Sequence, residues 1–506
     1  MSANTLTVAD IQELLSATPV NLTGHRPVVT SVVSSGRHDQ QASVFVAIRG
    51  SAADGHAFID EAFHHGAVLA VVTDAASLGG RPGLLVEDGR WALSALCAAF
   101  SGHPSKLLTT IGVTGTNGKT TVHWLIDHAL GRLGRPCLRI GSLGIAATGL
   151  FDRANTADLP GAGRILMTTP GPCEIHGAMR EAVDSGLECC VLETSSHAIH
   201  QHRTAHVLYD AAIFTNLSRD HLNYHGDMES YFETKADLFR QLARDGAGGV
   251  AVVNADCPYG RRLIDLCRVL GLRCVTFGES EGSLVRIIRF EQQLPLGELH
   301  LSVGESRLAV TTPLVGMYNA SNLAAAFAAL WALGYSEKDV ASAMCELPPV
   351  PGRLEAVGSE QLPVFVDYAH TGEGLKSVLS ALRAFAANDL WVVFGCGGGK
   401  DPGKRQAMGR AAAALADRIV LTNDNPRDED PQKIVREILA SGCRPELIEL
   451  DRGEAIRETL ERAVPGDVVL IAGKGREDYQ IVGRETLVYC DVDEVAKARE
   501  AGLLDR

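Results

Sequence analysis

The sequence predicts an α/β protein whose strands form mainly parallel sheets. Apolar, strand-like runs alternate with helical patterns over most of the chain. Glycine, aspartate, asparagine and histidine residues follow directly after the apolar runs in the middle and C-terminal parts. Strands that alternate with helices are typical of βαβ units. Open sheets of this kind bind ligands at the carboxyl ends of their strands, so these polar residues are candidates for a functional site.

The length of 506 residues suggests about three domains. We expect an N-terminal domain over residues 1–105, a central domain over 106–346 and a C-terminal domain over 347–506. The last boundary follows a proline-rich break, LPPVPGR, at 347–353. No internal repeat or low-complexity tract is visible.

Each expected domain has its own apolar runs. The N-terminal domain has strand-like runs at 44–50 and 67–74. Between them, residues 50–67 suggest a turn followed by a helix. The expected strands of the central domain are at 189–196, 211–217 and 249–256, besides the run at 107–113. The expected strands of the C-terminal domain are at 364–370, 390–399, 418–426 and 467–475.

Composition favours a cytoplasmic enzyme that acts on small molecules. The formal net charge of −14 and the absence of a basic run argue against a nucleic-acid surface. No secretion signal is visible at the start, and no apolar stretch reaches the ~18–20 residues that span a bilayer. The twelve cysteines are scattered without a C-x-x-C pair, so we expect reduced thiols.

Residues 110–121, TIGVTGTNGKTT, place a glycine turn between an apolar run and an expected helix at 121–133. Backbone N–H groups and the positive end of the helix dipole hold phosphate in such a turn. Lys119 would reach the β- and γ-phosphates, and the Thr120 hydroxyl would lie on Mg²⁺. The strict G-x-x-x-x-G-K-[ST] pattern is not met, because Val113 stands at its first glycine position. A chance glycine turn is the alternative to nucleotide binding.

Glu193 ends the apolar run that begins at Cys189. A carboxylate at this edge suits Mg²⁺ shared with ATP phosphates. The residues that follow, Thr194, Ser195 and Ser196, also suit the N-cap of the next helix, and both interpretations can hold together.

The segment 214–235 concentrates polar side chains: Asn216, Asp220, His221, His225 and Lys235. His221 and His225 are four residues apart, so a helix could pair them as zinc ligands. No cysteine pair or Glu-after-His motif supports zinc, and a single histidine is more often a surface or core residue. Lys235 lies in a helical pattern and, taken alone, is an ordinary amphipathic lysine.

Nine segments in order along the chain resemble the motifs of the ATP-dependent Mur ligases. They are GTNGKTT (115–121), MTTPGP (167–172), LETSSHAIHQHR (192–203), FTNLSRDHLNYHGDMESYFETK (214–235), PLVGMYNASNLAAA (313–326), PGRLE (351–355), VDYAHT (366–371), LTNDNPRDEDP (421–431) and AGKGREDYQ (472–480). The resemblance implies three domains: a UDP-sugar domain, a central P-loop ATPase-type domain with a parallel sheet, and a Rossmann-like amino-acid domain. It also implies the use of ATP and Mg²⁺, and we expect a monomer.

The resemblance is strongest to the branch of the family that adds meso-diaminopimelate to UDP-N-acetylmuramoyl-L-Ala-D-Glu in peptidoglycan synthesis. This pathway serves cell-wall biogenesis, cell shape and cell division. The partners implied are small molecules, namely a UDP-sugar peptide and an amino acid.

The resemblance assigns ATP and metal roles to particular residues. The matches to the ATP site are Gly115, Thr116, Asn117, Gly118, Lys119, Thr120, Thr121, the adenine-side residue Asn319, and Arg353, Asp367 and His370 of the third domain. The implied Mg²⁺ ligands are Thr120, Glu193, His221 and Lys235. Lys235 matches the carbamylated lysine of the family. Lys119, Lys235, His221 and Glu193 form the implied catalytic set.

The resemblance also assigns substrate roles. Thr168, Thr169, Ser195, Gln201 and Arg203 match residues that hold the peptidyl end of the nucleotide substrate. Ser35 lies in the turn that matches the UDP site. Around the amino acid, the matches are Lys400, Asp424, Asn425, Arg427, Gly473 and Glu477. A guanidinium can hold a carboxylate bidentately, so Arg427 would bind the distal carboxylate of diaminopimelate. The local alternative is an Asn-Pro turn with a solvated arginine.

The chemistry that the resemblance implies explains these residue types. A carboxylate attacks the γ-phosphate of ATP and gives an acyl phosphate and ADP. Lys119 and Mg²⁺ would lower the repulsion between the two anions. The neutral amine of the amino acid then displaces phosphate, and closure of the domains keeps water away. The base that keeps the amine neutral is not identified.

Several residues depart from the family pattern at the substrate sites. Ser34-Ser35-Gly36-Arg37 lacks the acid of the usual Asp-Ser-Arg turn, Gly399-Lys400 replaces Asp-Arg, and Arg476 replaces a histidine. A ligase acting on a different carboxylate substrate is therefore the main alternative. Others are a folylpolyglutamate or cyanophycin-type ligase, a non-catalytic ATP-binding protein, and a P-loop GTPase, for which no N-K-x-D motif is found.

Overall fold

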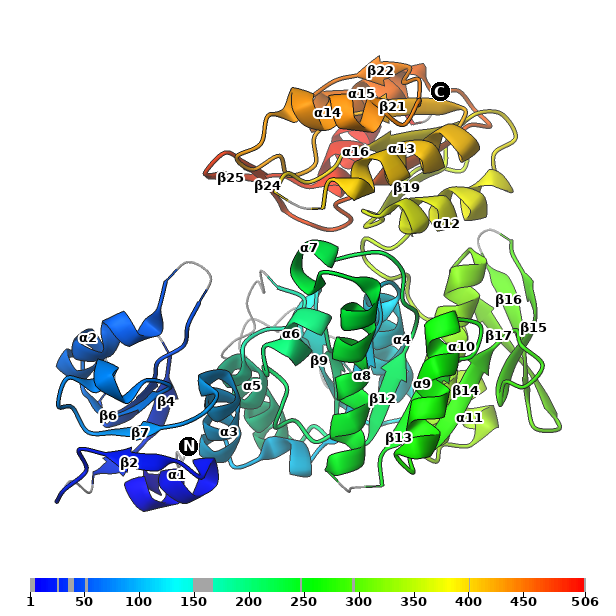
Figure 1. The fold of residues 1–506 in the computed structure, drawn as a ribbon. Coiled ribbons are helices and arrows are strands. Elements are labelled where there is room, and N and C mark those ends of the chain that lie inside the picture. Colours follow the sequence, from blue (N-terminus) through cyan, green and yellow to red (C-terminus); the bar gives the residue numbers. More distant parts are fainter. Residues whose placement is uncertain are drawn as a thin grey trace.

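The computed structural model describes residues 5–24, 27–34, 41–50, 53–148, 167–245, 248–293, 296–399 and 401–504. Each of the three predicted domains contains one larger sheet flanked by helices, which confirms the α/β class. In Figure 1 the N-terminal part (blue) lies beside the central part (cyan to green), and the C-terminal part (yellow to red) lies above it.

The N-terminal sheet has five strands in the order β2-β7-β6-β5-β4. Only the pairing of β2 with β7 is antiparallel. The strands of this part are β1 (Leu6–Thr7), β2 (Thr18–Val20), β3 (Val28–Val29), β4 (Ser31–Val33), β5 (Ser43–Val46), β6 (Ala67–Val72) and β7 (Gly83–Leu85). Its helices are α1 (Val8–Leu15), α2 (Ile59–His64) and α3 (Gly89–Phe100), with short 3₁₀ turns at Gly55–Phe58, Ala75–Leu78 and Pro104–Lys106.

The central sheet has ten strands in the order β10-β9-β11-β8-β12-β13-β14-β15-β16-β17. Its strands are β8 (Thr109–Thr114), β9 (Cys137–Gly141), β10 (Gly144–Thr148), β11 (Cys189–Glu193), β12 (Ala211–Phe214), β13 (Val250–Asn254), β14 (Arg273–Gly278), β15 (Val285–Glu291), β16 (Gly297–Val303) and β17 (Ser306–Thr312). The helices are α4 (Lys119–Arg132), α5 (Pro172–Asp184), α6 (Ser196–His200), α7 (Leu222–His225), α8 (Met228–Arg244), α9 (Pro258–Val269), α10 (Met317–Ala332) and α11 (Glu337–Met344).

The middle of this sheet is parallel, as predicted, whereas β10 at one edge and β16 and β17 at the other pair antiparallel. Side chains of α4, α10 and α11 pack on one face, and side chains of α5, α8 and α9 pack on the other. Because both faces are covered, the inner strands are buried along their length. This explains their continuous apolar runs.

The C-terminal sheet has the order β18-β19-β23-β20-β21-β22, and only β18 is antiparallel. The strands of this part are β18 (Glu355–Ala356), β19 (Val364–Asp367), β20 (Leu390–Phe394), β21 (Arg418–Leu421), β22 (Leu447–Ile448), β23 (Val468–Ala472) and the hairpin β24 (Tyr479–Val482) and β25 (Glu485–Val488). The helices are α12 (Gly372–Arg383), α13 (Gly403–Leu415), α14 (Pro431–Leu439), α15 (Arg452–Arg462) and α16 (Asp491–Glu500). Helices cover both faces, which confirms the Rossmann-like architecture.

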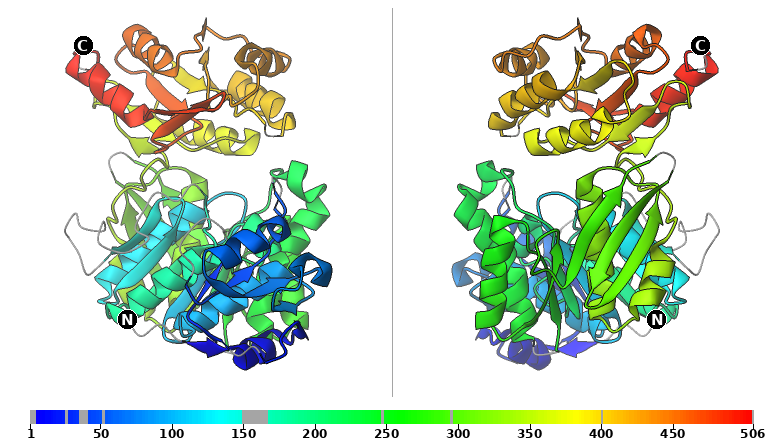
Figure 2. Two further views of the ribbon diagram at one scale, coloured as in Figure 1. Left: turned by 90° about the vertical axis from the view of Figure 1, so that its left-hand side faces the viewer. Right: turned by 90° about the vertical axis from the view of Figure 1, so that its right-hand side faces the viewer.

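The C-terminal part sits against one end of the central part in both further views (Figure 2). Loops that follow the central strands and loops that follow β19 and β23 line common cavities between the two parts. The predicted polar residues at the strand ends therefore lie at this junction.

The expectation of reduced thiols is wrong for one pair. Cys97 on α3 and Cys173 on α5 form a disulfide, with their Cα atoms 5.1 Å apart. The other ten cysteines are free. The pair is separated by 76 residues in sequence, so only the packing of α3 on α5 brings the two sulfur atoms together.

Over the ranges described above, no helix combines the length and the apolar character needed to cross a bilayer.

Candidate active site

The phosphate loop connects β8 to α4, which begins at Lys119, slightly earlier than predicted. Gly115 and Gly118 have φ values of 149° and 87°. A Cβ atom at Gly118 would lie 2.3 Å from the side-chain oxygen of Asn322, and one at Gly115 would lie 1.9 Å from the Thr215 hydroxyl. Both positions therefore need glycine. No side chain caps the N-terminus of α4, so its first N–H groups can bind an anion.

Lys119 folds back over this loop. Its ammonium donates hydrogen bonds to the carbonyl oxygens of Gly115 and Thr116, both at 2.9 Å. Burial lowers the pKa of Lys119, and the nearby Glu193 carboxylate opposes that effect. The ammonium is thus held at the mouth of the loop, where phosphate oxygens would meet it.

Asn216, a candidate from the histidine-rich segment, fixes the shape of the loop. Its side-chain oxygen accepts a hydrogen bond from the Asn117 N–H at 3.0 Å, and its side-chain amide donates to the Asn117 carbonyl oxygen at 3.1 Å. The Thr116 hydroxyl lies 3.2 Å from that of Tyr231 on α8. The chain after β12 therefore supports the loop from outside.

Glu193 lies at the end of β11 with its side chain fully buried. The Thr120 hydroxyl donates to its Oε2 atom at 3.0 Å, and the Ser142 N–H donates to its Oε1 atom at 2.8 Å. The structure thus brings two predicted metal ligands, Thr120 and Glu193, into contact. Ser142, in the turn between β9 and β10, was not identified from the sequence.

A Mg²⁺ ion needs hard oxygen ligands and usually takes only one or two carboxylates besides phosphates and water. Thr120 and Glu193 fit that requirement. Across the described ranges, no group of three or more His, Cys, Asp or Glu side chains is placed to hold a metal ion alone. Any Mg²⁺ here would therefore depend on ATP phosphates for the rest of its coordination.

His221 and His225 do not form the zinc pair considered from the sequence. His221 precedes α7 with φ 55°, and its Nε2 atom lies 3.3 Å from the Asp220 carboxylate. His225 ends α7, and its Nε2 atom lies 3.0 Å from the Ser196 hydroxyl. The Nε2 atoms of the two imidazoles therefore face different partners.

Lys235 is not the ordinary amphipathic lysine that its local pattern suggests. It lies on α8 and is only 1% exposed. Its ammonium donates to the Gly115 carbonyl oxygen at 2.9 Å and lies 4.8 Å from the centre of the Tyr231 ring. Burial, reinforced by the charge of Lys119, holds the pKa of Lys235 well below its usual range.

The residues matched to the peptidyl substrate form one cluster beside Glu193. The Thr169 hydroxyl donates to the Glu193 backbone carbonyl oxygen at 2.7 Å and lies 3.1 Å from the Ser195 hydroxyl. Arg203 donates to the Thr169 carbonyl oxygen at 2.8 Å and to the Gln201 side chain at 3.1 Å. Ser195 is also the N-cap of α6. The alternative interpretation of this segment, as the N-cap of the next helix, therefore holds as well.

A cavity of about 390 Å³ opens above the phosphate loop. Its lining includes Gly118, Lys119, Thr120, Glu193, Asp220 and His221 from the central part, and Arg353, Asp367, Tyr368 and His370 from the C-terminal part. The predicted third-domain residues therefore do face the loop.

Within this cavity, Asn322 lies on the wall, whereas Asn319 lies behind it. The Asn319 side chain donates to the Val315 carbonyl oxygen at 2.8 Å and accepts from Asn322 at 3.1 Å. Asn319 and Asn322 are three residues apart on α10, so they are neighbours on the helix surface. This spacing is the sequence feature that could have identified Asn322.

Arg353 and Asp367 connect the C-terminal part to the loop in different ways. Arg353 donates to the Thr120 hydroxyl at 2.9 Å and lies 4.3 Å from the centre of the Tyr368 ring. Asp367 accepts from the N–H groups of Leu354 and Ala369 at 2.6 and 2.7 Å. Burial raises the pKa of Asp367, and Arg353 opposes the shift. Asp367 thus holds the backbone on which Arg353 is placed.

A second cavity of about 650 Å³ adjoins the first. Ser142, Thr168, Arg353 and Tyr368 line both cavities. On the C-terminal side, the rest of the larger cavity is lined by Pro351, Gly352, Lys474, Arg476, Glu477, Asp478 and Tyr479.

Of the residues matched to the amino acid, Glu477 lines this second cavity. Glu477 accepts from the Asn425 side chain at 3.0 Å and from the Lys474 ammonium at 2.8 Å. A Cβ atom at Gly473 would lie 2.7 Å from the Asp424 carboxylate, so these two positions are in contact. Lys474 was not identified from the sequence, although it lies within the quoted AGKGREDYQ segment.

Arg427 is not a solvated arginine. It has φ 54°, and its guanidinium donates to the Gly398 carbonyl oxygen at 2.9 Å. It lies next to Asn425 but does not line either cavity. Ser35 and Lys400, and the neighbouring departures at Gly36 and Arg37, fall outside the described residues.

Comparison with known proteins agrees with this arrangement. A model of the Mur ligase middle domain matches residues 113–330, and a model of the Mur ligase glutamate ligase domain matches residues 352–475. The chain is 38% identical over 485 residues to UDP-N-acetylmuramoyl-L-alanyl-D-glutamate–2,6-diaminopimelate ligase of Geobacillus thermodenitrificans, covering 94% of this chain and 96% of that protein. The ligase of the same name from Thermosynechococcus vestitus is 38% identical over 503 residues, or 97% of each chain.

A solved structure of a protein with this name is also similar. It has a TM-score of 0.65 and 30% sequence identity, and the match covers 94% of this chain and 95% of that one.

Proposed function

The chain belongs to the Mur ligase family, and we propose that it joins meso-diaminopimelate to UDP-N-acetylmuramoyl-L-Ala-D-Glu in an ATP-dependent, ADP-forming reaction. The product would be the tripeptide precursor used in peptidoglycan synthesis. The alternative of a ligase for a different carboxylate is not favoured, because identity of 38% extends over nearly the whole chain to ligases named for these substrates.

One observation supports this function most directly. The cavity above the phosphate loop and the larger cavity beside Glu477 share the wall residues Ser142, Thr168 and Arg353. A γ-phosphate in the first cavity and an amine in the second would meet at this wall. A carboxylate held there can be phosphorylated from one side and attacked from the other.

In the first step, a carboxylate oxygen of the D-glutamyl residue bonds to the γ-phosphorus as the bond to the bridging oxygen of ADP breaks. Lys119 and the N-terminus of α4 lie where the phosphate charge must be held. Arg353 contacts Thr120 at 2.9 Å, so it would add a positive charge from the opposite side. Mg²⁺ held by Thr120 and Glu193 would supply further charge neutralisation.

In the second step, the amine bonds to the acyl carbon, the bond to the phosphate oxygen breaks and a proton leaves the nitrogen. Lys474 and Glu477 line the second cavity and would orient the amino acid, and Asn425 donates a hydrogen bond to Glu477. Positioning both reactants in adjoining cavities replaces a bimolecular encounter. Enclosure between two parts of the chain excludes water from the acyl phosphate.

We include the carbamate of Lys235 in this proposal. Carbamylation requires a neutral amine, and burial lowers the pKa of Lys235. The carbamate would place oxygen ligands under the phosphate loop, and His221 would be a further protein ligand to Mg²⁺. Both assignments depend on the family match and on the position of the side chains.

The direct test is phosphate release with ATP, Mg²⁺ and UDP-N-acetylmuramoyl-L-Ala-D-Glu, with mass spectrometry of the products. Meso-diaminopimelate, L-lysine and no amino acid are compared. Turnover only with diaminopimelate, giving the tripeptide, is expected. A folded, ATP-binding protein that is inactive with every mixture would contradict the proposed substrates.

A further inference from the structure

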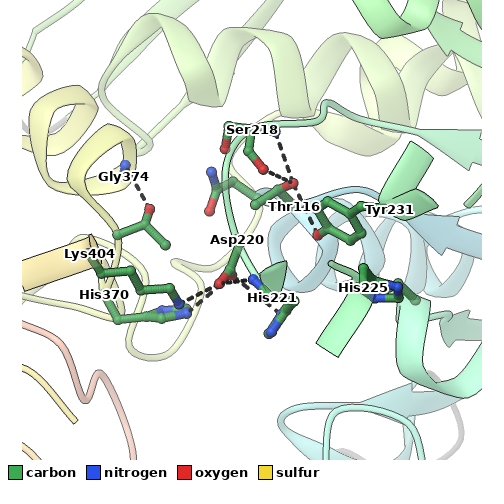
Figure 3. Close-up of polar contacts among 12 residues, drawn as sticks. Thr116, Ser218, Asp220, His221, His225, Tyr231, His370, Gly374 and Lys404 are labelled. Carbon is green, nitrogen blue, oxygen red and sulfur yellow. Dashed lines mark hydrogen bonds and ion pairs between the residues drawn. The ribbon is translucent and has the colours of Figure 1, made fainter. Parts of the chain in front are cut away.

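Asp220 lies at the centre of a cluster of polar and titratable side chains at the junction of the central and C-terminal parts (Figure 3). It lies on the segment between β12 and α7, and its side chain is 3% exposed. The N–H of His221 donates to its carboxylate at 2.7 Å. This contact fixes the orientation of the carboxylate from within the central part.

Two further partners come from the C-terminal part. The Lys404 ammonium, in the first turn of α13, forms a close ion pair with Asp220. The Nε2 atom of His370, on the loop after β19, lies 3.8 Å from the other carboxylate oxygen. In Figure 3 both side chains extend from the C-terminal ribbon toward the same carboxylate. One central residue therefore contacts two separate elements of the C-terminal part.

This ion pair is far less exposed to solvent than a surface ion pair. The Lys404 side chain is only 15% exposed, so water and salt screen the attraction poorly. The Lys404 ammonium and the Asp220 carboxylate carry opposite charges, so their contact draws the two parts of the chain together.

A second ion pair between the same two parts offers a contrast. Arg219 lies 3.7 Å from Asp401, but the Arg219 side chain is 66% exposed. Exposed pairs contribute little, so this neighbour serves as a control for Asp220.

The position of the cluster connects it to the ATP cavity. Asp220 and His370 both line that cavity, together with Lys119 and Thr120. The His370 ring is also held by the Tyr368 carbonyl oxygen, 3.0 Å from Nδ1. Moving Asp220 away from Lys404 would therefore release one wall of the cavity.

We propose that Asp220 is a positioning residue that docks the C-terminal part onto the phosphate loop through Lys404 and His370. This inference rests on the proposed function in taking the cavity as the ATP site. The docking itself is a physical property that can be measured without turnover.

The test compares the unaltered protein with D220N, K404M, K404R, the charge exchange D220K/K404D, and the control R219Q. Small-angle X-ray scattering with and without ADP reports how closely the two parts are held. Steady-state kinetics with ATP give KM and kcat separately. Thermal unfolding identifies any variant that fails to fold, and K404M, on a partly exposed helix end, provides a second route if D220N is unstable.

We expect D220N and K404M to have a larger radius of gyration than the unaltered protein and a KM for ATP raised about tenfold. K404R keeps the positive charge and should retain most of the contact with Asp220. D220K/K404D restores a pair of opposite charges and should recover part of the contact. R219Q should match the unaltered protein. A general loss of stability would not produce recovery in the exchange variant.

Equal scattering and equal KM for ATP in folded D220N, K404M and the unaltered protein would overturn the docking role. If the unaltered protein releases no phosphate with any substrate mixture, the proposed function fails instead. The scattering comparison would still decide the role of Asp220, so the two failures are distinguishable.

Discussion

The ammonium of Lys235 lies 2.9 Å from the carbonyl oxygen of Gly115, so a helix residue from the far side of the sheet supports the first glycine of the phosphate loop. Both residues lie within the central part, but they belong to different βα units. Their contact makes Lys235 part of the phosphate site whether or not its amine carries a carbamate.

Replacing Lys235 with alanine should reduce kcat by at least about 100-fold, because the loop loses a buried hydrogen bond and the carbamate loses its amine. Added bicarbonate should not restore activity. Labelling with ¹³C-bicarbonate should give a carbamate signal in the unaltered protein that is missing in K235A. The exposed Lys338 on α11 serves as the control, since K338A should retain both signal and activity. Near-normal turnover in K235A would contradict this role.

Gly118→Ala should weaken ATP binding about tenfold or more, because the new methyl group meets the side chain of Asn322 at the head of α4. Gly134→Ala is the matched control. Gly134 also has a positive φ, at 73°, but no atom lies within 4 Å of its added Cβ. Both variants should lose about 1 kcal/mol of unfolding free energy, and only G118A should lose affinity in calorimetric titration with ATP. Equal ATP affinities in G118A and G134A would show that the loop accommodates the added methyl group.

Arg427→Lys should raise the KM for diaminopimelate about tenfold and leave the KM for ATP unchanged, because lysine lacks the planar fork that grips a carboxylate. The present contact of Arg427 with the Gly398 carbonyl oxygen would have to give way to the substrate. Arg436→Lys, on the exposed side of α14, should change neither constant. An unaltered diaminopimelate KM in R427K would assign Arg427 a structural role only.

His176 on α5 should make stability depend on pH. Burial lowers its pKa to about 3, and neither ring nitrogen has a hydrogen-bond partner among the described residues. Below the ordinary histidine pKa of about 6.5, the unfolded chain takes up a proton that the folded protein refuses. Stability is therefore complete above that pH and falls as the pH drops toward 3.

This residue alone should account for about 0.8 kcal/mol lost between pH 8 and pH 6. The unfolding free energy is measured by urea unfolding at pH 8 and at pH 6. His176→Leu should reduce the difference between the two values by this amount. His64→Gln, at an exposed position, should leave the pH dependence as it is. A dependence in H176L equal to that of the unaltered protein would show that other groups carry it.

Several features of the fold follow from local patterns. The apolar runs at 189–193 and 468–472 are buried on both faces in a parallel sheet, and such strands need continuous apolar sequence. The loop at 115–118 is likewise readable, because its glycines occupy positions with positive φ that other residues avoid. The antiparallel edge strands β16 and β17 were not predicted, since alternating half-buried residues there give a weaker signal.

Other features depend on distance in space rather than in sequence. Ser142 reaches Glu193 because β9 and β11 are neighbours in the sheet. Cys97 and Cys173 were expected to be free and are paired, because α3 packs on α5.

The sequence by itself determined the α/β class, the phosphate loop and the order of the motifs, because these are set by local side-chain periodicity and by backbone conformations that only certain residues adopt. The tertiary structure decided that Lys235 is buried, that Asn322 rather than Asn319 lies on the cavity wall, and that Asp220 contacts Lys404. Each of these depends on how helices pack on sheets and how one part of the chain meets another. Such contacts join residues that have no fixed spacing in the sequence. Their strength depends on burial, which cannot be read from a local sequence pattern.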